Sequence, residues 1–252
     1  MLRAPKLTKA QIDHFHNAGS LVVHGAFSAA DAKRFQKLTD ELAAVPEVSG
    51  KQWVYHEKSL KDSSKRLISR IENIRPFHTG FKELGDALLA PVGQLLGEPA
   101  VMFKEKVNFK MPGGDGFKPH QDSQAGWDKY ADFFISVMVG IDEATVENGC
   151  LEIVEGHHKR GLFRSWEPLT DADMADMKFI HVPTMPGDMI FFDCYAPHQS
   201  QPNMSSKIRR LYYATYNKLS AGDHMAQYYA DKHKSYPPDI DREKGKEYVF
   251  RV

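Results

Sequence analysis

The sequence predicts a mainly β protein, a jelly-roll barrel of the double-stranded β-helix (cupin-like) type with N-terminal helices packed on it. Helical patterns fill the first hundred residues, strand patterns separated by Gly and Pro turns follow from Val101, and no repeat, linker or low-complexity tract divides the 252 residues. Short strands joined by such turns are typical of jelly rolls. We expect a single domain over 1–252, mostly helical over about 1–100, with the jelly-roll core at about 101–220 and a C-terminal extension at 221–252.

The N-terminal region carries three helical patterns. Thr8 is a typical N-cap and Gly19 a typical helix end, so a first helix is predicted between them. Ser28 opens a second helix, in which apolar residues recur at spacings of three and four. A third pattern runs over about 79–96, and a short strand is expected at 20–24.

The remaining elements are predicted to be strands. Alternation over 101–111 predicts a strand with two different faces. One face carries Lys104, Lys106, Asn108 and Lys110, and the other carries Phe103, Glu105, Val107 and Phe109. Further strands are expected at 133–141, 150–154, 178–182, 188–192 and 208–217.

Composition excludes several classes of function. The 33 Lys and Arg residues balance 33 Asp and Glu residues, so no net charge favours nucleic acid or an anionic membrane as a partner. Two cysteines, Cys150 and Cys194, are too few for a disulfide framework or a cysteine-built metal site. We see no apolar signal segment and no run of about 20 apolar residues, so a cytoplasmic protein is expected. The oligomeric state is left open.

A metal site is predicted from three residues. His120 and Asp122 are two apart, and in a strand such residues point to the same face, so both can hold one ion. His198 follows the turn and strand at 186–192. Two histidines and one carboxylate with open positions make the facial triad of Fe(II) oxygenases. Arg209 opens the last strand and, with the Ser200 hydroxyl, is placed to bind the far carboxylate of a metal-bound keto-diacid.

These residues resemble the phytanoyl-CoA dioxygenase family of Fe(II)/2-oxoglutarate oxygenases. The resemblance covers His120-x-Asp122, the 148–159 string N-G-C-L-E-I-V-E-G-H-H-K, and the segment from 186–188 to His198, Ser200 and Arg209. It implies that the protein is an enzyme in which His120, Asp122 and His198 bind Fe(II), and that 2-oxoglutarate and O2 are its co-substrates. It also implies hydroxylation, because halogenating relatives replace the carboxylate that Asp122 supplies here.

The resemblance also implies roles for residues outside the triad. By likeness to the ectoine-hydroxylase branch, Asn108 meets the C1 carboxylate of 2-oxoglutarate, and Lys106 then points at the primary substrate. The pocket side offers polar and aromatic groups rather than a long apolar tunnel, so a small polar or zwitterionic substrate is expected. The substrate-binding residues are predicted to be Lys106, Gln121, Gln124, Trp127 and Tyr130.

A finer resemblance concerns the substrate itself. The stretches 104–127 and 141–149 are similar to bacterial 2-aminoethylphosphonate dioxygenases, which hydroxylate the carbon next to phosphorus in organophosphonate catabolism. A doubly charged phosphonate favours Lys or Arg donors, and Lys106 is one. The partner of the amine is not assigned by the sequence, and Glu72 is a candidate only as an acid in the region 51–75.

Two alternatives stay open. The same chemistry on a trimethylated aminophosphonate, or on another small amine or amino acid, would be favoured by an aromatic cage around Trp127, Tyr130 or Trp53. The other alternative is a non-catalytic jelly-roll binding protein whose His/Asp cluster holds zinc or nothing.

Overall fold

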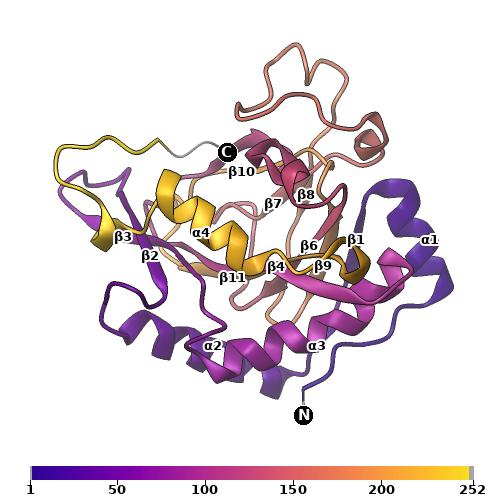
Figure 1. Cartoon of the computed structure of the whole chain (residues 1–252), viewed down its shortest axis with the longest axis horizontal. Helices are drawn as coiled ribbons and strands as arrows, with labels where there is room; N and C mark the ends of the chain where they lie inside the picture. The colour runs from indigo at the N-terminus through magenta and orange to yellow at the C-terminus, as the bar shows by residue number, and fades with distance from the viewer. Residues whose placement is uncertain (1, 250–252) are drawn as a thin grey trace.

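The computed structural model describes residues 2–249, which form two antiparallel sheets and four α-helices (Figure 1). The larger sheet has the strand order β1-β9-β6-β11-β4-β3-β2, and the smaller has the order β5-β10-β7-β8. The larger sheet contains β1 (Ser20–Val23), β2 (Trp53–Lys58), β3 (Arg66–Glu72), β4 (Ala100–Lys110), β6 (Phe134–Gly140), β9 (Met189–Asp193) and β11 (Arg209–Lys218). The smaller contains β5 (Phe117–His120), β7 (Leu151–Ile153), β8 (Ile180–Val182) and β10 (His198–Ser200). The helices are α1 (Lys9–Ala18), α2 (Ala29–Ala44), α3 (Thr79–Leu96) and α4 (Met225–Ser235).

The predicted helix ends are confirmed by their hydrogen bonds. Thr8 and Gln11 form a capping box at the start of α1, and Gly19 ends that helix with φ 80°. Ser28 and Asp31 cap α2 in the same way. Within residues 2–249, none of the helices combines the length and the apolar character that crossing a bilayer requires.

The first hundred residues contain two strands that the sequence analysis did not expect. Residues 53–58 and 66–72 pair as the hairpin β2–β3, and β3 then pairs with β4. This corrects the expectation of a mostly helical region, and the overall content is mixed α and β rather than mainly β. The local signal was the β-branched and aromatic run at Trp53, Val54 and Tyr55, whose side chains are all buried.

The two faces of the larger sheet bury different layers. On one face α3 packs Phe81, Leu84 and Leu88 into a core that also contains Val107 and Tyr216. On the other face a second core joins residues of both sheets, among them Leu151, Ile153, Ile190, Phe192 and Leu211. Apolar residues of both sheets therefore pack together here, and polar side chains of β4, β5 and β10 line a cavity beside them.

A β-bulge in β4 changes which face Phe103 occupies. Thr215 of β11 lies opposite Lys104 and Tyr216 lies opposite Met102, so Phe103 is an extra residue in the pairing. Its ring packs against the rings of Trp127 and Phe134, with centroids 5.5 and 4.6 Å away. The sequence analysis placed Phe103 with Glu105, Val107 and Phe109, and this was wrong because strict alternation does not survive a bulge.

Candidate metal centre and substrate cavity

The three predicted metal ligands lie together where β5 and β10 meet. His120 ends β5, His198 begins β10, and the two residues are direct partners in the antiparallel pairing. Asp122 has left the strand and begins a 3₁₀ turn (Asp122–Ala125), so the strand argument for this pair does not hold, although the two side chains still converge. The ligand atoms of His120, Asp122 and His198 all lie within 4.8 Å of one another, the one such cluster of three or more His, Cys, Asp or Glu ligands within residues 2–249.

Hydrogen bonds hold each ligand in an orientation that suits a metal. The Nδ1 atoms of His120 and His198 donate to the carbonyl oxygens of Lys118 and Ala196, at 2.6 and 3.0 Å, which leaves both Nε2 atoms for an ion. The Ser136 hydroxyl donates to Asp122 Oδ2 at 2.5 Å.

The ionisation states of these three side chains also suit a metal. Burial lowers the pKa of His120 to about 3 and that of His198 as well, so both imidazoles are neutral. Burial alone would raise the pKa of Asp122, but the neighbouring His198 and Lys104 outweigh it and keep the carboxylate charged. Two neutral imidazoles and one carboxylate fit Fe(II) with open coordination positions.

A small cavity of about 40 Å³ lies on the inner side of this cluster, lined by residues that include Asn108, Ser200 and Tyr213. Asn108 Oδ1 and Arg209 Nε are buried atoms without a hydrogen-bond partner among the described residues. Such atoms are costly to bury unless a ligand satisfies them. Asn108 lines the small cavity, so its unpaired atom fits a small polar co-substrate such as 2-oxoglutarate, whereas Arg209 is not among the lining residues and lies opposite Lys110 in the sheet.

Lys110, which the sequence analysis placed on the same strand face as Lys106 and Asn108, belongs to the same region. It lies opposite Arg209 in the sheet and donates through Nζ to Ser200 Oγ at 2.7 Å. Burial, together with the charge of Arg209, lowers the pKa of Lys110 to about 6. An anion bound beside Lys110 and Arg209 would favour the charged form of Lys110.

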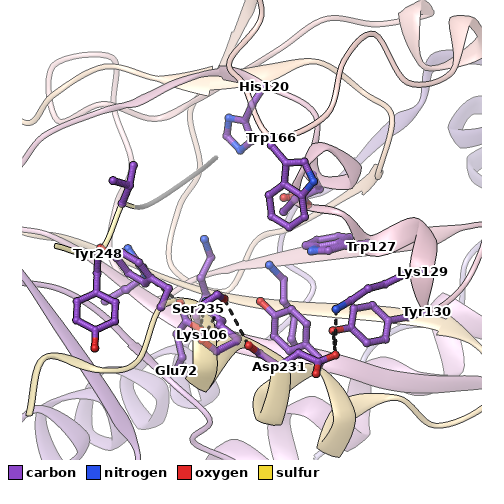
Figure 2. Close-up of a pocket in the computed structure, with 18 of the residues that line it drawn as sticks. Glu72, Lys106, His120, Trp127, Lys129, Tyr130, Trp166, Asp231, Ser235 and Tyr248 are labelled. Carbon is purple, nitrogen blue, oxygen red and sulfur yellow. Dashed lines mark hydrogen bonds and ion pairs between the residues drawn. The ribbon is translucent and has the colours of Figure 1, made fainter. Parts of the chain in front are cut away.

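A larger cavity of about 650 Å³ opens on the outer side of His120 and Asp122 (Figure 2). Lys104 and Lys106 of β4 line it, and α4 contributes Tyr228 and Lys232. Burial lowers the pKa of Lys106 to about 7 and that of Lys232 to about 8. The remaining lining residues are Arg70, Glu72, Phe117, Ala125, Trp127, Lys129, Tyr130, Trp166, Asp231, Ser235, Tyr236, Glu247, Tyr248 and Val249.

Two acids that line this cavity, Glu72 and Asp231, already have cationic partners. Glu72 accepts hydrogen bonds from Arg70 Nε at 2.7 Å and from Lys232 Nζ at 2.5 Å. Burial would raise the pKa of Glu72, but Lys232 and Arg70 reverse that effect and lower it. Asp231 likewise accepts from Lys129 Nζ and from the Tyr130 hydroxyl, both at 2.9 Å. Glu72 is therefore part of an ion network rather than a free partner for a substrate amine.

The three aromatic residues that could have formed a cage, Trp53, Trp127 and Tyr130, do not surround a common space. Lys104 Nζ lies 4.1 Å from the centre of the Trp127 ring, and Lys129 Nζ lies 4.6 Å from that of Tyr130. Trp53 packs edge-on against Tyr229 in an aromatic core and is not a lining residue of the cavity. A lysine ammonium thus lies over each of the two candidate rings that line the cavity. This arrangement disfavours an aromatic cage made of Trp53, Trp127 and Tyr130 around a trimethylated ammonium group.

Gln121 and Gln124 lie beside the cavity but face away from it. Both are fully buried. Gln121 Nε2 donates to the carbonyl oxygens of Gly161 and Tyr195 at 2.8 and 2.7 Å, and Gln124 Nε2 donates to that of Glu167 at 2.7 Å. Their polar atoms bind the backbone, so the structure brings Lys106, Trp127 and Tyr130 to the cavity but not these two glutamines.

Several lining residues had no local motif in the sequence, and Glu72 was named there only as an acid in the region 51–75. Arg70 and Glu72 lie on the unexpected strand β3, Lys232 lies on α4 in the C-terminal extension, and Trp166 lies in the loop between β7 and β8. Each reaches the cavity through tertiary packing, so no local spacing relates these residues to His120.

Comparison with known proteins agrees with the geometry. The family described as "Phytanoyl-CoA dioxygenase (PhyH)" matches residues 15–211. The 2-aminoethylphosphonate dioxygenase of the uncultured bacterium HF130_AEPn_1 is 36% identical over 248 residues, covering 96% of this chain and 93% of that protein. The methylphosphonate hydroxylase of Gimesia maris is 36% identical over 234 residues, covering 91% and 88%.

Solved structures support the fold. EctD from S. alaskensis, determined with 2-oxoglutarate and 5-hydroxyectoine, superposes with a TM-score of 0.74 at 23% identity, covering 85% of this chain and 77% of that one. The chain therefore belongs to the phytanoyl-CoA dioxygenase family and is an Fe(II)- and 2-oxoglutarate-dependent dioxygenase, with His120, Asp122 and His198 as its candidate facial triad.

Proposed function

We propose that this enzyme hydroxylates a small phosphonate at the carbon next to phosphorus, with 2-aminoethylphosphonate as the first candidate. The observation that carries the proposal is the position of Lys104 and Lys106, which project from β4 into the cavity that also reaches His120 and Asp122. Arg70 and Lys232 add positive charge, while the buried acid Glu72 neutralises only part of it. A phosphonate carries up to two negative charges and three acceptor oxygens, which suits such a cluster of donors.

The two named relatives support the same substrate class. Both carry a phosphonate in their names, and one of these, methylphosphonate, has no amine. Methylphosphonate is therefore a second candidate substrate. A non-catalytic binding protein is set aside because both the family and the triad are those of dioxygenases.

The proposed roles of the chain's residues follow from their positions. Lys104 and Lys106 bind the phosphonate oxygens, and the carbon attached to phosphorus then lies toward the triad. Asn108 is proposed to contact the C1 carboxylate of 2-oxoglutarate, while Arg209 and Ser200 bind its far carboxylate. Fe(II) with 2-oxoglutarate and O2 supplies the oxidant, and the overall change converts one C–H bond to C–OH with release of succinate and CO2.

A substrate panel tests this proposal. Iron-loaded protein is mixed with 2-oxoglutarate, O2 and one compound at a time: 2-aminoethylphosphonate, methylphosphonate, a trimethylated aminophosphonate, or small amino acids. We expect succinate in amounts equal to a product that gains one oxygen atom, for 2-aminoethylphosphonate first. Slow succinate release without any oxidised phosphonate would reject the substrate while leaving the dioxygenase chemistry intact.

A further inference from the structure

A loop between β7 and β8 is attached to the segment that carries the metal ligands. Besides the bonds from Gln121 to Gly161 and from Gln124 to Glu167, the backbone N–H of Phe163 donates to Gln121 Oε1 at 2.8 Å. Two backbone bonds complete the attachment, from Trp166 N–H to the Gln124 carbonyl at 2.7 Å and from Leu169 N–H to the Pro119 carbonyl at 2.8 Å. Five hydrogen bonds thus hold residues 161–169 against residues 119–124, next to His120 and Asp122.

The conformation of Trp166 is unusual. Its φ of 64° is in the left-handed region, and within residues 2–249 Asn73 is the other non-glycine residue there. Asn tolerates this region, whereas for a bulky side chain it is strained. The indole lies over Gly126, where a Cβ atom would come within 2.2 Å of Trp166 Cζ2. Strain of this kind persists when surrounding contacts enforce it and is often associated with function.

Among residues 2–249, Trp166 is also the lining indole or phenyl-type ring of this cavity over which no Lys or Arg side chain lies. A Lys or Arg side chain lies over each of the other lining rings, which are Phe117, Trp127, Tyr130, Tyr228, Tyr236 and Tyr248. Within residues 2–249 no Lys or Arg side chain lies over Trp166, which is 47% exposed. Figure 2 shows its indole on the His120 side of the cavity, with Lys106 across from it.

We infer that Trp166 binds the ammonium group of the substrate through a cation–π contact and so selects aminoalkyl phosphonates over simple alkyl phosphonates. This inference rests on the proposed function. A zwitterion has to place its two charges apart, and the cavity offers lysines on one side and an open indole face on the other. Among the acids that line the cavity, Glu72 and Asp231 are already paired with cations and Asp122 belongs to the metal triad, which leaves the exposed Glu247 as the other lining group that could attract the ammonium. Trp166 is thus a specificity-determining residue rather than a part of the metal centre.

The test compares an amine with its uncharged analogue of similar size, 2-aminoethylphosphonate and propylphosphonate. Dissociation constants are measured by calorimetry on the iron- and 2-oxoglutarate-loaded protein without O2, and kcat and KM are measured with O2. For Trp166→Leu we expect binding of 2-aminoethylphosphonate to weaken about tenfold, with binding of propylphosphonate changed less than about twofold. Trp166→Phe should restore part of the difference because phenylalanine keeps an aromatic face.

Met204→Ala is the matched control, because Met204 is 55% exposed and is not a lining residue of the cavity. Thermal unfolding checks that each variant is folded. Equal weakening of both ligands in Trp166→Leu, or no weakening of the amine, would overturn the inference while the proposed function stands. If the wild-type protein neither binds nor hydroxylates any of these phosphonates, the proposed function and the inference both fail.

Discussion

On one face of strand β4, Lys104, Lys106 and Asn108 point into the cavities beside the metal ligands, whereas on the other face Val107 and Phe109 lie in the core beneath the N-terminal helices. The same backbone therefore serves as the floor of a site and as the centre of a core. The cavity face carries like charges whose pKa values are lowered by burial. The core face carries apolar side chains that are almost fully buried. The comparison teaches that residues one position apart contribute to different properties, binding on one face and stability on the other.

Each face has an exception that refines the comparison. On the core face Glu105 is a buried carboxyl that accepts a hydrogen bond from the Tyr212 hydroxyl at 2.7 Å. On the cavity face the bulge at Phe103 turns an aromatic ring toward Trp127. If the two faces of β4 are independent, substitutions on the cavity face should leave stability unchanged, and substitutions on the core face should leave substrate binding unchanged.

The largest effect is expected at the metal centre that the cavity face adjoins. His198→Ala removes one ligand, so iron content and phosphonate-dependent succinate formation should both fall to background, while thermal unfolding changes little. His14→Ala is the control, because this histidine is exposed on α1. Full activity in His198→Ala would show that the triad is wrongly assigned.

The next largest effect is expected at Lys106. Lys106→Met keeps the length of the side chain and removes its charge, so kcat/KM for the phosphonate should fall about 10- to 100-fold. The unfolding free energy should stay the same or rise, since an unfavourable buried charge is lost. Steady-state kinetics and chemical denaturation measure the two quantities, and Lys58→Met at the exposed end of β2 serves as control. A loss of stability with unchanged kinetics would reverse the assignment of the faces.

A change of stability alone is expected on the core face. Val107 is fully buried, and Val107→Ala leaves a cavity beneath the helices that should cost about 2 kcal/mol of unfolding free energy. Because Lys106 and Asn108 keep their directions, KM for the phosphonate should change less than twofold. Denaturant unfolding and steady-state kinetics on the same preparation decide between independent and coupled faces.

The last effect concerns the buried acid and appears only as a dependence of stability on pH. Burial raises the pKa of Glu105 to about 7, above the ordinary value of 4.5, so the folded protein binds a proton more tightly than the unfolded chain. The unfolding free energy should therefore fall as pH rises from about 5 to 7, by at most about 1.4 kcal/mol per pH unit. Glu105→Gln should remove this part of the pH dependence. If the unfolding free energies of the wild-type protein and of Glu105→Gln fall in parallel between pH 5 and 7, the Glu105 carboxyl is not the source of the pH dependence.

The sequence predicted those features that depend on local patterns. Caps at Thr8 and Ser28 and the alternation after Lys104 are local, and the structure confirms them. The triad could be assembled because the family motif relates His120, Asp122 and His198 across the chain.

What could not be predicted depends on tertiary packing. Arg70 and Lys232 come to one cavity only after β3 joins the sheet and α4 packs on β4. Gln121 and Gln124 are next to metal-binding positions in sequence, yet their side chains turn to the loop that carries Trp166. Their positions in the sequence indicated that both residues lie near the metal, but not where their side chains point. The hydrogen bonds available to each side-chain amide set that direction.

The central claim is that the cationic face of β4 presents a phosphonate to the metal centre. The most direct measurement is phosphorus NMR and mass spectrometry of a reaction of iron-loaded protein with 2-oxoglutarate, 2-aminoethylphosphonate and isotopically heavy O2. We predict a new phosphonate signal from a product that is hydroxylated at the carbon next to phosphorus and contains one heavy oxygen atom, formed together with an equal amount of succinate. An unchanged phosphonate signal from protein that contains iron and still converts 2-oxoglutarate to succinate would contradict this account.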